Sequence, residues 1–138
     1  MPAELGKQKN NVVKVDSISN TEKYKIEVIA TLCHNINKAY SQALCDENQV
    51  SWYKLPEEIK QSVRLGVKKV MLNPYMEADE IHEEWVKDKK KNGWKLGDIK
   101  DIDKKTHPNL VSFNKLPKEE QAKDYIFISI VRQLMYII

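Results

Sequence analysis

The C-terminal segment, from about Lys118 to Tyr136, places the strongest constraint on how this chain can fold. Leu116-Pro117 followed by Glu119 and Glu120 is typical of a helix start, because proline fits the first turn and acids offset the positive end of the helix dipole. The apolar residues after this start leave almost no polar face: Tyr125, Ile126, Phe127, Ile128, Ile130, Val131, Leu134 and Met135. A helix of this kind must be buried. We expect it either at the centre of the core or packed against a second subunit.

Three further helices are predicted before this segment. Apolar residues recur at three- and four-residue spacing over about 21–44, with Asn20 or Thr21 as the N-cap. A second helix is expected to begin at Pro56 and to end before Asn73-Pro74. A third is expected over about 77–91, apolar on one face and densely charged on the other. Residues 21–138 are therefore predicted to form one mainly helical domain.

Two segments do not follow a helical pattern. Residues 94–116 alternate in polarity, which favours a short two-stranded hairpin or an ordered loop. Residues 1–20 are polar and are expected to be a flexible N-terminal arm, although Val12, Val13 and Val15 could form a short strand. No internal repeat is visible in the chain. The predicted fold class is mainly α (α+β), with about four helices and a short β-hairpin.

Composition narrows the range of functions. The net charge of +3, from 23 Lys and Arg against 20 Asp and Glu, is too mild for a dedicated nucleic-acid binder. Arg64 and Arg132 are the only arginines, and a surface ion pair is favoured over an anion contact for each.

The two cysteines, Cys33 and Cys45, are expected to be reduced thiols. With no secretory signal and no long apolar run, a cytoplasmic protein is expected.

Enzymatic motifs are absent from the sequence. Cys33 and His34 are adjacent, so on a helix their side chains diverge by about 100° and make a poor nucleophile–base pair. His34, His82 and His107 lack metal-ligand spacing, and no glycine-rich phosphate loop is present. We therefore predict no catalytic residue, no metal site and no cofactor.

The strongest candidate for a ligand site is a lysine-rich segment that Trp85 and Trp94 bracket. From Lys87 to Lys105 it carries 8 Lys and 4 Asp. Aromatic faces and ammonium groups suit a nucleotide base and its phosphates, but Trp85 could equally be a core residue. His107 either bonds a ligand or pins its loop, with pinning favoured. Asn37 and His34 on the first helix either line a pocket or satisfy buried backbone groups.

Four segments, taken together, resemble the ryanodine receptor repeat, or RyR domain. They are Cys33 to Tyr40 (CHNINKAY), the W-x-K-x-K-x-x-x-G-W pattern from Trp85 to Trp94, the stretch from Gly97 to the HPNLV of residues 107–111, and Leu116-Pro117 with Lys123-Asp124-Tyr125. The resemblance spans about residues 25–136. It implies a mostly helical fold with a short hairpin, and a single-repeat member of a bacterial or phage group.

The resemblance also implies a function. Paired repeats of the family are similar to a nucleotide-binding module in which aromatic residues stack on adenine. The implied function is non-catalytic binding of a nucleotide or nucleotide-derived signal in bacterial or phage defence or counter-defence. A homodimer would bring two repeats together for this purpose. In the resulting hypothesis Trp85 stacks on the base, Lys89, Lys105 and Arg132 face phosphate, and His107 and Asn37 donate or accept hydrogen bonds. The alternative is a protein–protein interaction module that uses an exposed Trp52/Tyr53 loop and the apolar C-terminus.

Overall fold

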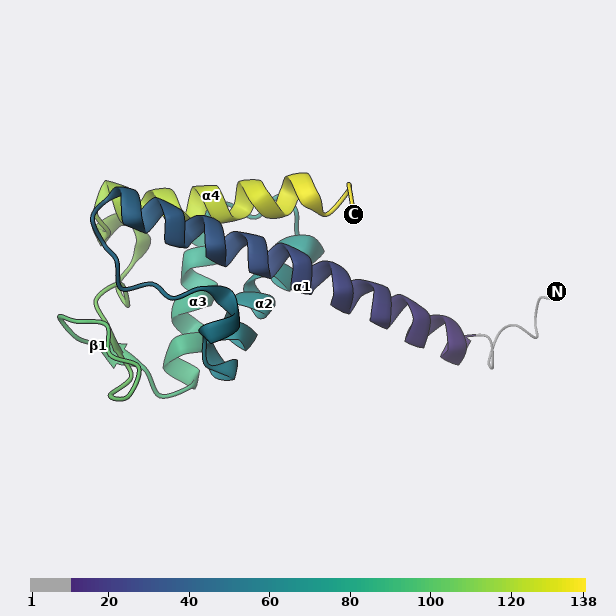
Figure 1. The fold of residues 1–138 in the computed structure, drawn as a ribbon, viewed down its shortest axis with the longest axis horizontal. Coiled ribbons are helices and arrows are strands. Elements are labelled where there is room, and N and C mark those ends of the chain that lie inside the picture. Colours follow the sequence, from purple (N-terminus) through teal and green to yellow (C-terminus); the bar gives the residue numbers. More distant parts are fainter. Residues whose placement is uncertain (1–10) are drawn as a thin grey trace.

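The computed structural model describes the backbone of residues 11–138, and side chains from residue 20 onward. Its elements in chain order are α1 (Asn11–Ala43), the 3-10 helix η2 (Trp52–Lys54), α2 (Glu57–Leu72), α3 (Ala78–Lys91), β1 (Lys95–Leu96), β2 (Thr106–His107), the 3-10 helix η3 (Phe113–Lys115) and α4 (Lys118–Leu134). Figure 1 shows this arrangement. The prediction of a mainly helical domain with four α-helices and a small β element is confirmed.

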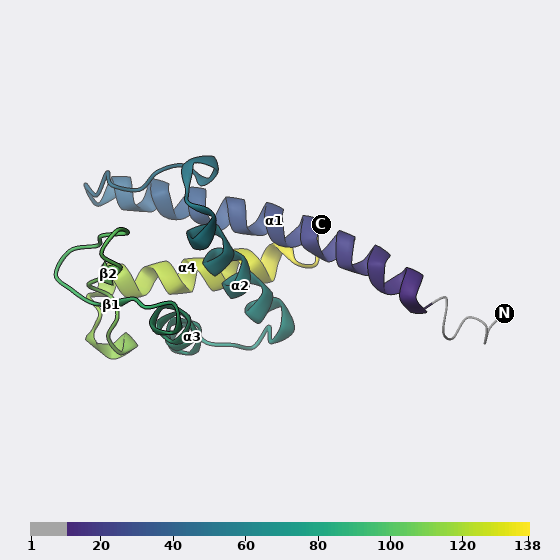
Figure 2. The same ribbon diagram turned by 90° about the horizontal axis from the view of Figure 1, so that it is seen from below.

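Helix α4 packs against the rest of the fold along one stripe, which includes Ile128 and Val131. It lies beside α1 and runs in the opposite direction; both helices pack against α2, and α3 packs against α2 and α4 (Figures 1 and 2). Each of the three other α-helices contacts it. This apolar helix therefore contributes to the core of the single chain, and its packing against a second subunit stays a prediction.

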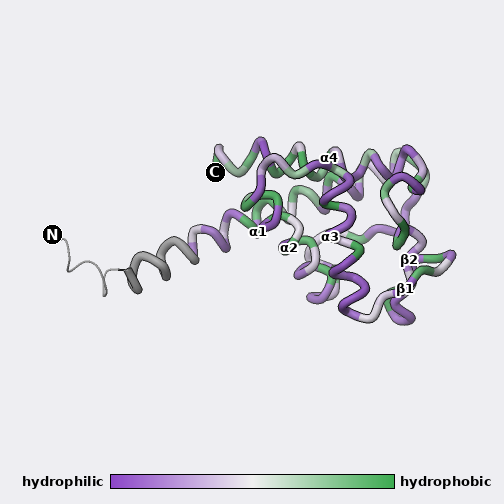
Figure 3. Tube along the Cα trace, turned by 180° about the vertical axis from the view of Figure 1, so that it is seen from behind, coloured by the Kyte–Doolittle hydropathy of each residue, from purple (hydrophilic) through white to green (hydrophobic). Residues whose placement is uncertain are grey.

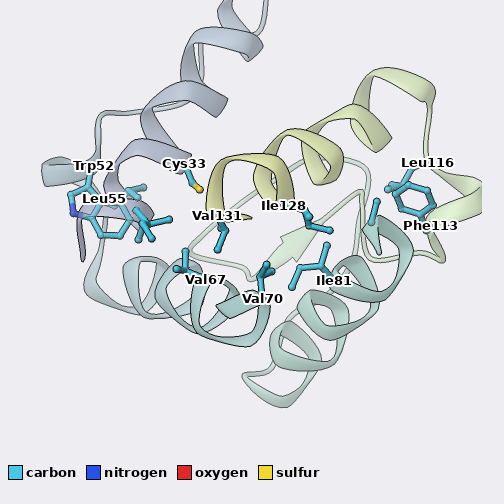
Figure 4. Packing of buried hydrophobic residues seen from close by; sticks show 13 residues of the cluster. Cys33, Trp52, Leu55, Val67, Val70, Ile81, Phe113, Leu116, Ile128 and Val131 are labelled. Carbon is cyan, nitrogen blue, oxygen red and sulfur yellow. The ribbon is translucent and has the colours of Figure 1, made fainter. Parts of the chain in front are cut away.

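The core forms where the helices meet α4. Val131 is 0% exposed and Ile128 is 4% exposed, and in Figure 4 both lie between α1 and the helix pair α2–α3. Val67 and Val70 of α2 and Ile81 of α3 pack in the same cluster. Burying an aliphatic side chain of this size contributes about 1.5–3 kcal/mol, so this contact accounts for much of what holds the helices together.

Helix α1 is longer than predicted. It begins at Asn11 rather than near Asn20, so residues 11–20 continue the helix, and the short strand considered for Val12, Val13 and Val15 does not form. The rest of the predicted arm, residues 1–10, lies outside the described residues. The N-terminal part of α1 extends past the other helices (Figures 1 and 2).

Trp52, predicted to be exposed, is only 6% exposed. Its indole Nε1 donates to Glu27 Oε2 of α1 at 3.1 Å, and the Arg64 guanidinium of α2 lies over the ring at 5.5 Å. Arg64 also pairs with Glu27 at 2.7 Å, which holds the pKa of the Glu27 carboxyl below its usual range. The ion pair expected for Arg64 therefore joins α1 to α2 across the tryptophan. Of the two aromatic residues in this loop, only Tyr53 faces solvent.

A six-residue pattern precedes both α2 and α4, although no internal repeat was visible from the sequence. Ser51 to Pro56 reads SWYKLP and Ser112 to Pro117 reads SFNKLP. In each copy the aromatic residue begins a 3-10 helix, the leucine is buried, and the proline has φ −59° at the N-cap. In both places the segment redirects the chain so that the helix can begin, and its aromatic residue and leucine pack in the core. The helix starts predicted at the two Leu-Pro pairs are confirmed.

The predicted hairpin is wrong in direction. β1 pairs with β2 in parallel, with Lys95 opposite Thr106 and Leu96 opposite His107. The tight turn falls at Asp101–Thr106, which exchange backbone hydrogen bonds of 3.0 and 3.1 Å, so the chain has reversed once more before it reaches β2. Leu110 and Phe113, expected in the second strand, are buried against the helices instead. Their alternation with polar residues reflects burial rather than strand pairing.

Two glycines make this connection possible. Gly93, at φ +90°, ends α3 in a conformation that residues with a side chain rarely adopt. A Cβ on Gly97 would lie 2.7 Å from the Thr106 side chain, so only glycine allows β1 and β2 to approach this closely.

Helix α3 has the two-sided character expected of it. Its tube is mainly coloured hydrophilic in Figure 3. Ile81 and His82 are nonetheless buried on its inner side. No helix in the described part of the chain is long and apolar enough to span a membrane.

Burial in the core predicts which side chains can be shortened to alanine without destabilising the fold. Ile29 of α1 is 0% exposed in the core, so Ile29→Ala should lower the free energy of unfolding by about 2–5 kcal/mol through lost burial and a cavity. Leu72→Ala is the matched control: Leu72 is 77% exposed, and the change should be within about 0.5 kcal/mol. Urea denaturation measures both. Equal effects of the two substitutions would contradict this assignment of the core.

Candidate functional site

A cavity of about 420 Å³ lies among the helices and the segment that follows α3. All four α-helices contribute to its lining, together with Trp94, Lys100 and residues 107–109 of that segment. Its apolar wall includes Ile59, Val63 and Phe127, and charged and aromatic side chains line the remainder. An apolar cavity of this size with a few polar groups is typical of small-molecule sites.

Trp85 reaches the cavity from α3 and is half-buried. His82 lies nearly parallel to its indole, with ring centroids 5.5 Å apart and an interplanar angle of 28°. His107 meets it edge-on, with centroids 5.0 Å apart. Trp85 is thus part of an aromatic cluster in the cavity wall.

Lys89, one turn further along α3, is only 5% exposed. Its ammonium lies 4.7 Å from the centre of the Trp94 ring, and it forms no side-chain hydrogen bond or ion pair with any described residue. Burial lowers its pKa, as do the charges of Lys100 and Lys105, whereas the nearby carboxylates of Asp88 and Glu58 act against this shift. Because it forms no ion pair, this largely buried lysine is available to bind an anionic ligand.

His107 lines the cavity from β2 as a neutral imidazole. Its Nδ1 accepts a hydrogen bond from the backbone N–H of Asn109 at 3.0 Å, which places the ring proton on Nε2. Burial lowers the pKa of His107 to about 3, helped by the positive charges of Lys100, Lys89 and Lys123. The histidine therefore both pins its own loop, as favoured from the sequence, and has a donor N–H left for a further partner.

Asn37 also lines the cavity, from α1. Four of the six residues predicted to bind a ligand, Asn37, Trp85, Lys89 and His107, therefore lie around one cavity although they come from three separate elements. Trp94, the second tryptophan of the segment, is 4% exposed, and its Nε1 donates to Glu58 at 3.4 Å.

Arg132 and Lys105 lie outside this cavity. The Arg132 guanidinium donates to the backbone carbonyls of Pro74 and Met76, each at 2.6 Å, so it holds the connection between α2 and α3 in place. Lys105 Nζ donates to the Asn92 carbonyl at 2.9 Å and lies 3.5 Å from Glu58, so it fastens the end of α3. Both predicted phosphate contacts have structural partners instead.

Sequence reasoning gave no ligand role to Lys123, Asp124 and His82, which also line the cavity, and it named Lys100 only as part of the lysine-rich segment. Lys123 and Asp124 stood within a motif segment, His82 was considered only as a metal ligand, and His34 was expected either to line a pocket or to satisfy buried backbone groups. Each is a common surface residue type, and only the packing of α3, α4 and the intervening loop brings them together. His34 Nε2 lies 2.6 Å from the Val50 carbonyl, so that histidine also pins a loop.

Asp124 is the most perturbed acid of the cavity. Burial and the nearby negative charge of Glu120 raise the pKa of its carboxyl to about 7. Its Oδ2 lies 3.6 Å from His82 Nδ1, and His82 Nε2 bonds the Val111 carbonyl at 2.7 Å. Near neutral pH this carboxyl therefore exists in both protonation states and can donate as well as accept a hydrogen bond.

Two observations bear on chemistry at this site. Burial raises the pKa of the Cys33 thiol to about 12, so this cysteine is a poor nucleophile near neutral pH. In the described part of the chain no group of three or more His, Cys, Asp and Glu side chains could hold a metal ion.

Asp124 gives stability a pH dependence that Asp124→Asn should remove. The folded carboxyl titrates near 7 against 3.8 for an unperturbed group, so its contribution is fully present below the unfolded pKa and is lost as pH rises through the folded pKa. Relative to the wild type, the variant's free energy of unfolding should rise by up to about 4 kcal/mol from near pH 4 to near pH 8. His107 is present in both proteins, so its titration does not contribute to the difference between their free energies of unfolding. Urea denaturation across this pH range measures the difference, and a constant difference would show that Asp124 is not perturbed.

Comparison with protein families gives one match. The model of the RyR domain matches residues 67–137, which is just over half of the 138-residue chain. The range covers part of α2, all of α3, β1, β2 and α4, and therefore most of the cavity lining. Three of the four segments that carried the resemblance lie inside it, and Cys33 to Tyr40 lies outside.

Proposed function

This chain belongs to the RyR domain family, and we propose that the cavity among its helices binds a nucleotide or a nucleotide-derived signalling molecule without changing it chemically. The observation that carries the proposal is Lys89, a residue that is only 5% exposed and whose ammonium forms no ion pair among the described residues, in an aromatic-lined cavity. A phosphate oxygen would supply that partner. The cavity volume of about 420 Å³ falls within the usual range for small-molecule sites.

The proposed binding mode assigns one task to each residue. The base packs against the part of the Trp85 indole that faces the cavity, and the phosphate meets Lys89. His107 donates from Nε2, and the Asn37 amide donates or accepts at the opposite wall. Base–aromatic stacking contributes about 1–3 kcal/mol and charge-assisted hydrogen bonds about 1.5–3 kcal/mol, so these contacts together suit a micromolar ligand.

Binding without catalysis fits the groups that line the cavity. The Cys33 thiol has a raised pKa, and the backbone contacts of His34 and His107 each engage one ring nitrogen. Sensing or sequestering a nucleotide signal, as in bacterial or phage defence and counter-defence, requires binding alone. The setting is part of the proposal.

A homodimer also stays a proposal. The cavity is lined by residues of a single chain, so a second copy is not needed to form it. Light scattering at micromolar concentration measures the mass, and a monomeric mass would exclude the dimer without affecting the site.

The second candidate function is a protein–protein interaction module. One observation favours it: Tyr136 and Ile137, beyond the end of α4, are 75% and 72% exposed. The Trp52/Tyr53 loop was also expected to belong to this interaction surface. Of its two aromatic residues only Tyr53 is exposed, because Trp52 is buried. A thermal-shift screen against mono-, di- and cyclic nucleotides separates the two functions, since a ligand at a hundredfold excess over its Kd adds about 2.7 kcal/mol of stability. No shift across the panel would favour the interaction module.

Lys89→Met should have opposite effects on stability and on binding. Methionine keeps the length of the side chain and removes the buried unpaired charge, so the unliganded protein should keep or gain stability. Nucleotide affinity should fall by about tenfold or more, because the phosphate loses its cation. Lys90→Met is the matched control on the same helix, since Lys90 is exposed and outside the cavity lining. Calorimetry and urea denaturation measure the two effects, and a destabilised Lys89→Met would assign Lys89 a structural role against Trp94.

Trp85→Ala should weaken nucleotide binding by about tenfold or more while the protein stays folded, since a stacked base loses about 1–3 kcal/mol. Tyr53→Ala, at an exposed aromatic outside the cavity, should leave affinity unchanged. Circular dichroism reports folding and calorimetry reports affinity. If Trp85→Ala unfolds, Trp85 is a core residue, and the Lys89 pair of variants then decides the proposal alone.

A further inference from the structure

The charges that line the cavity identify the class of nucleotide it can hold. Four lysines and five carboxylates line it: Lys69, Lys89, Lys100 and Lys123 against Asp46, Glu84, Asp88, Glu120 and Asp124. Lys69 pairs with Glu84 at 2.8 Å, and Lys123 pairs with Glu120 at 3.1 Å. The formal charge of the lining is therefore close to zero, and two of its cations are already engaged.

The two remaining lysines come from different elements. Lys89 lies on α3, and Lys100, an exposed residue of the cavity lining, lies in the loop between β1 and β2. Neither forms an ion pair among the described residues, and the charge of Lys100 contributes to the lowered pKa of Lys89. Both charges also contribute to the lowered pKa of His107, so the positive potential is concentrated around that imidazole.

Carboxylates occupy the space around these two cations. Asp88 lines the cavity next to Lys89 in sequence and accepts a hydrogen bond from Ser62 at 3.0 Å. Asp46 is close enough to Lys100 to affect its pKa, and Glu120 accepts a hydrogen bond of 2.7 Å from the Asn109 amide. An anion larger than one phosphate group would extend from the two lysines towards these acids. In a partly desolvated cavity, like charges a few ångströms apart repel by several kcal/mol.

Resting on the proposed function, we propose that the cavity takes a nucleotide with a single phosphate group, a monophosphate or a cyclic phosphodiester, held between Lys89 and Lys100, and that it rejects triphosphates. One phosphate matches the two unpaired ammonium groups and the Nε2–H of His107. A triphosphate carries a charge of about −4 near neutral pH, and the lining holds no further free cation to offset it. Lys100 thereby becomes a specificity-determining residue of the site.

The test compares nucleotides that share a base and differ in phosphate. Calorimetry with adenosine, AMP, cyclic AMP and ATP, and with the matching guanosine series, is done without added magnesium, which would mask charge. AMP, cyclic AMP or a guanine counterpart should bind at least about tenfold more tightly than the triphosphate with the same base. Lys100→Met should weaken binding of the single-phosphate nucleotide by about tenfold and leave the nucleoside unchanged. Lys90→Met should change neither.

The outcomes separate the inference from the function on which it rests. A triphosphate that binds as tightly as the monophosphate overturns the inference and leaves the proposed function standing. Unchanged affinity in Lys100→Met, with a folded protein by circular dichroism, also overturns the inference. If no nucleotide and no nucleoside in either series binds, the proposed function itself fails.

Discussion

The packing of α4 against the three other α-helices is the interaction on which the rest of the structure depends. Helices α2 and α3 each offer one apolar side, and Val131 and Ile128 of α4 fill the space where those sides and α1 meet. The same placement positions the site. The first turns of α4, with Glu120, Lys123 and Asp124, lie beside the loop that carries Lys100 and His107. Helix α4 thus both contributes to the core and brings its polar first turns to the cavity.

The cavity contains two ionisable side chains that lower the stability of the unliganded protein. Lys89 is a buried cation without an anionic partner, and Asp124 is a buried acid whose pKa is about 7. Each costs free energy in the unliganded protein, whereas apolar residues of similar size would not. Under the proposed function this cost is offset when a phosphate meets Lys89. Arg64 and Arg132 provide the contrast, because their guanidinium groups are satisfied by carboxylates or carbonyls and contribute to stability.

How far the sequence could predict this structure depends on the range of each interaction. The starts of α2 and α4 were predictable because Leu-Pro followed by acids acts within one helical turn. The direction of the β1–β2 pair was not, since it depends on where the chain reverses a second time. Trp85, Lys89 and His107 were predictable as one site through their motif. Lys105 and Arg132 were assigned by charge alone, and the partners that engage them come from residues distant in sequence or across a turn.

The sequence by itself determined the helical fold class and the family, because each follows from local periodicity or from motifs in fixed order. For the last helix it predicted burial, and it left open whether the core or a second subunit covers it. The tertiary structure alone decided which lysines are free. Lys89, Lys100 and Lys105 are the same residue type in one lysine-rich segment, and nothing local distinguishes them. Their difference arises from desolvation and from distance to a carboxylate or carbonyl, and both quantities exist only once α1, α3, α4 and the loop are packed together.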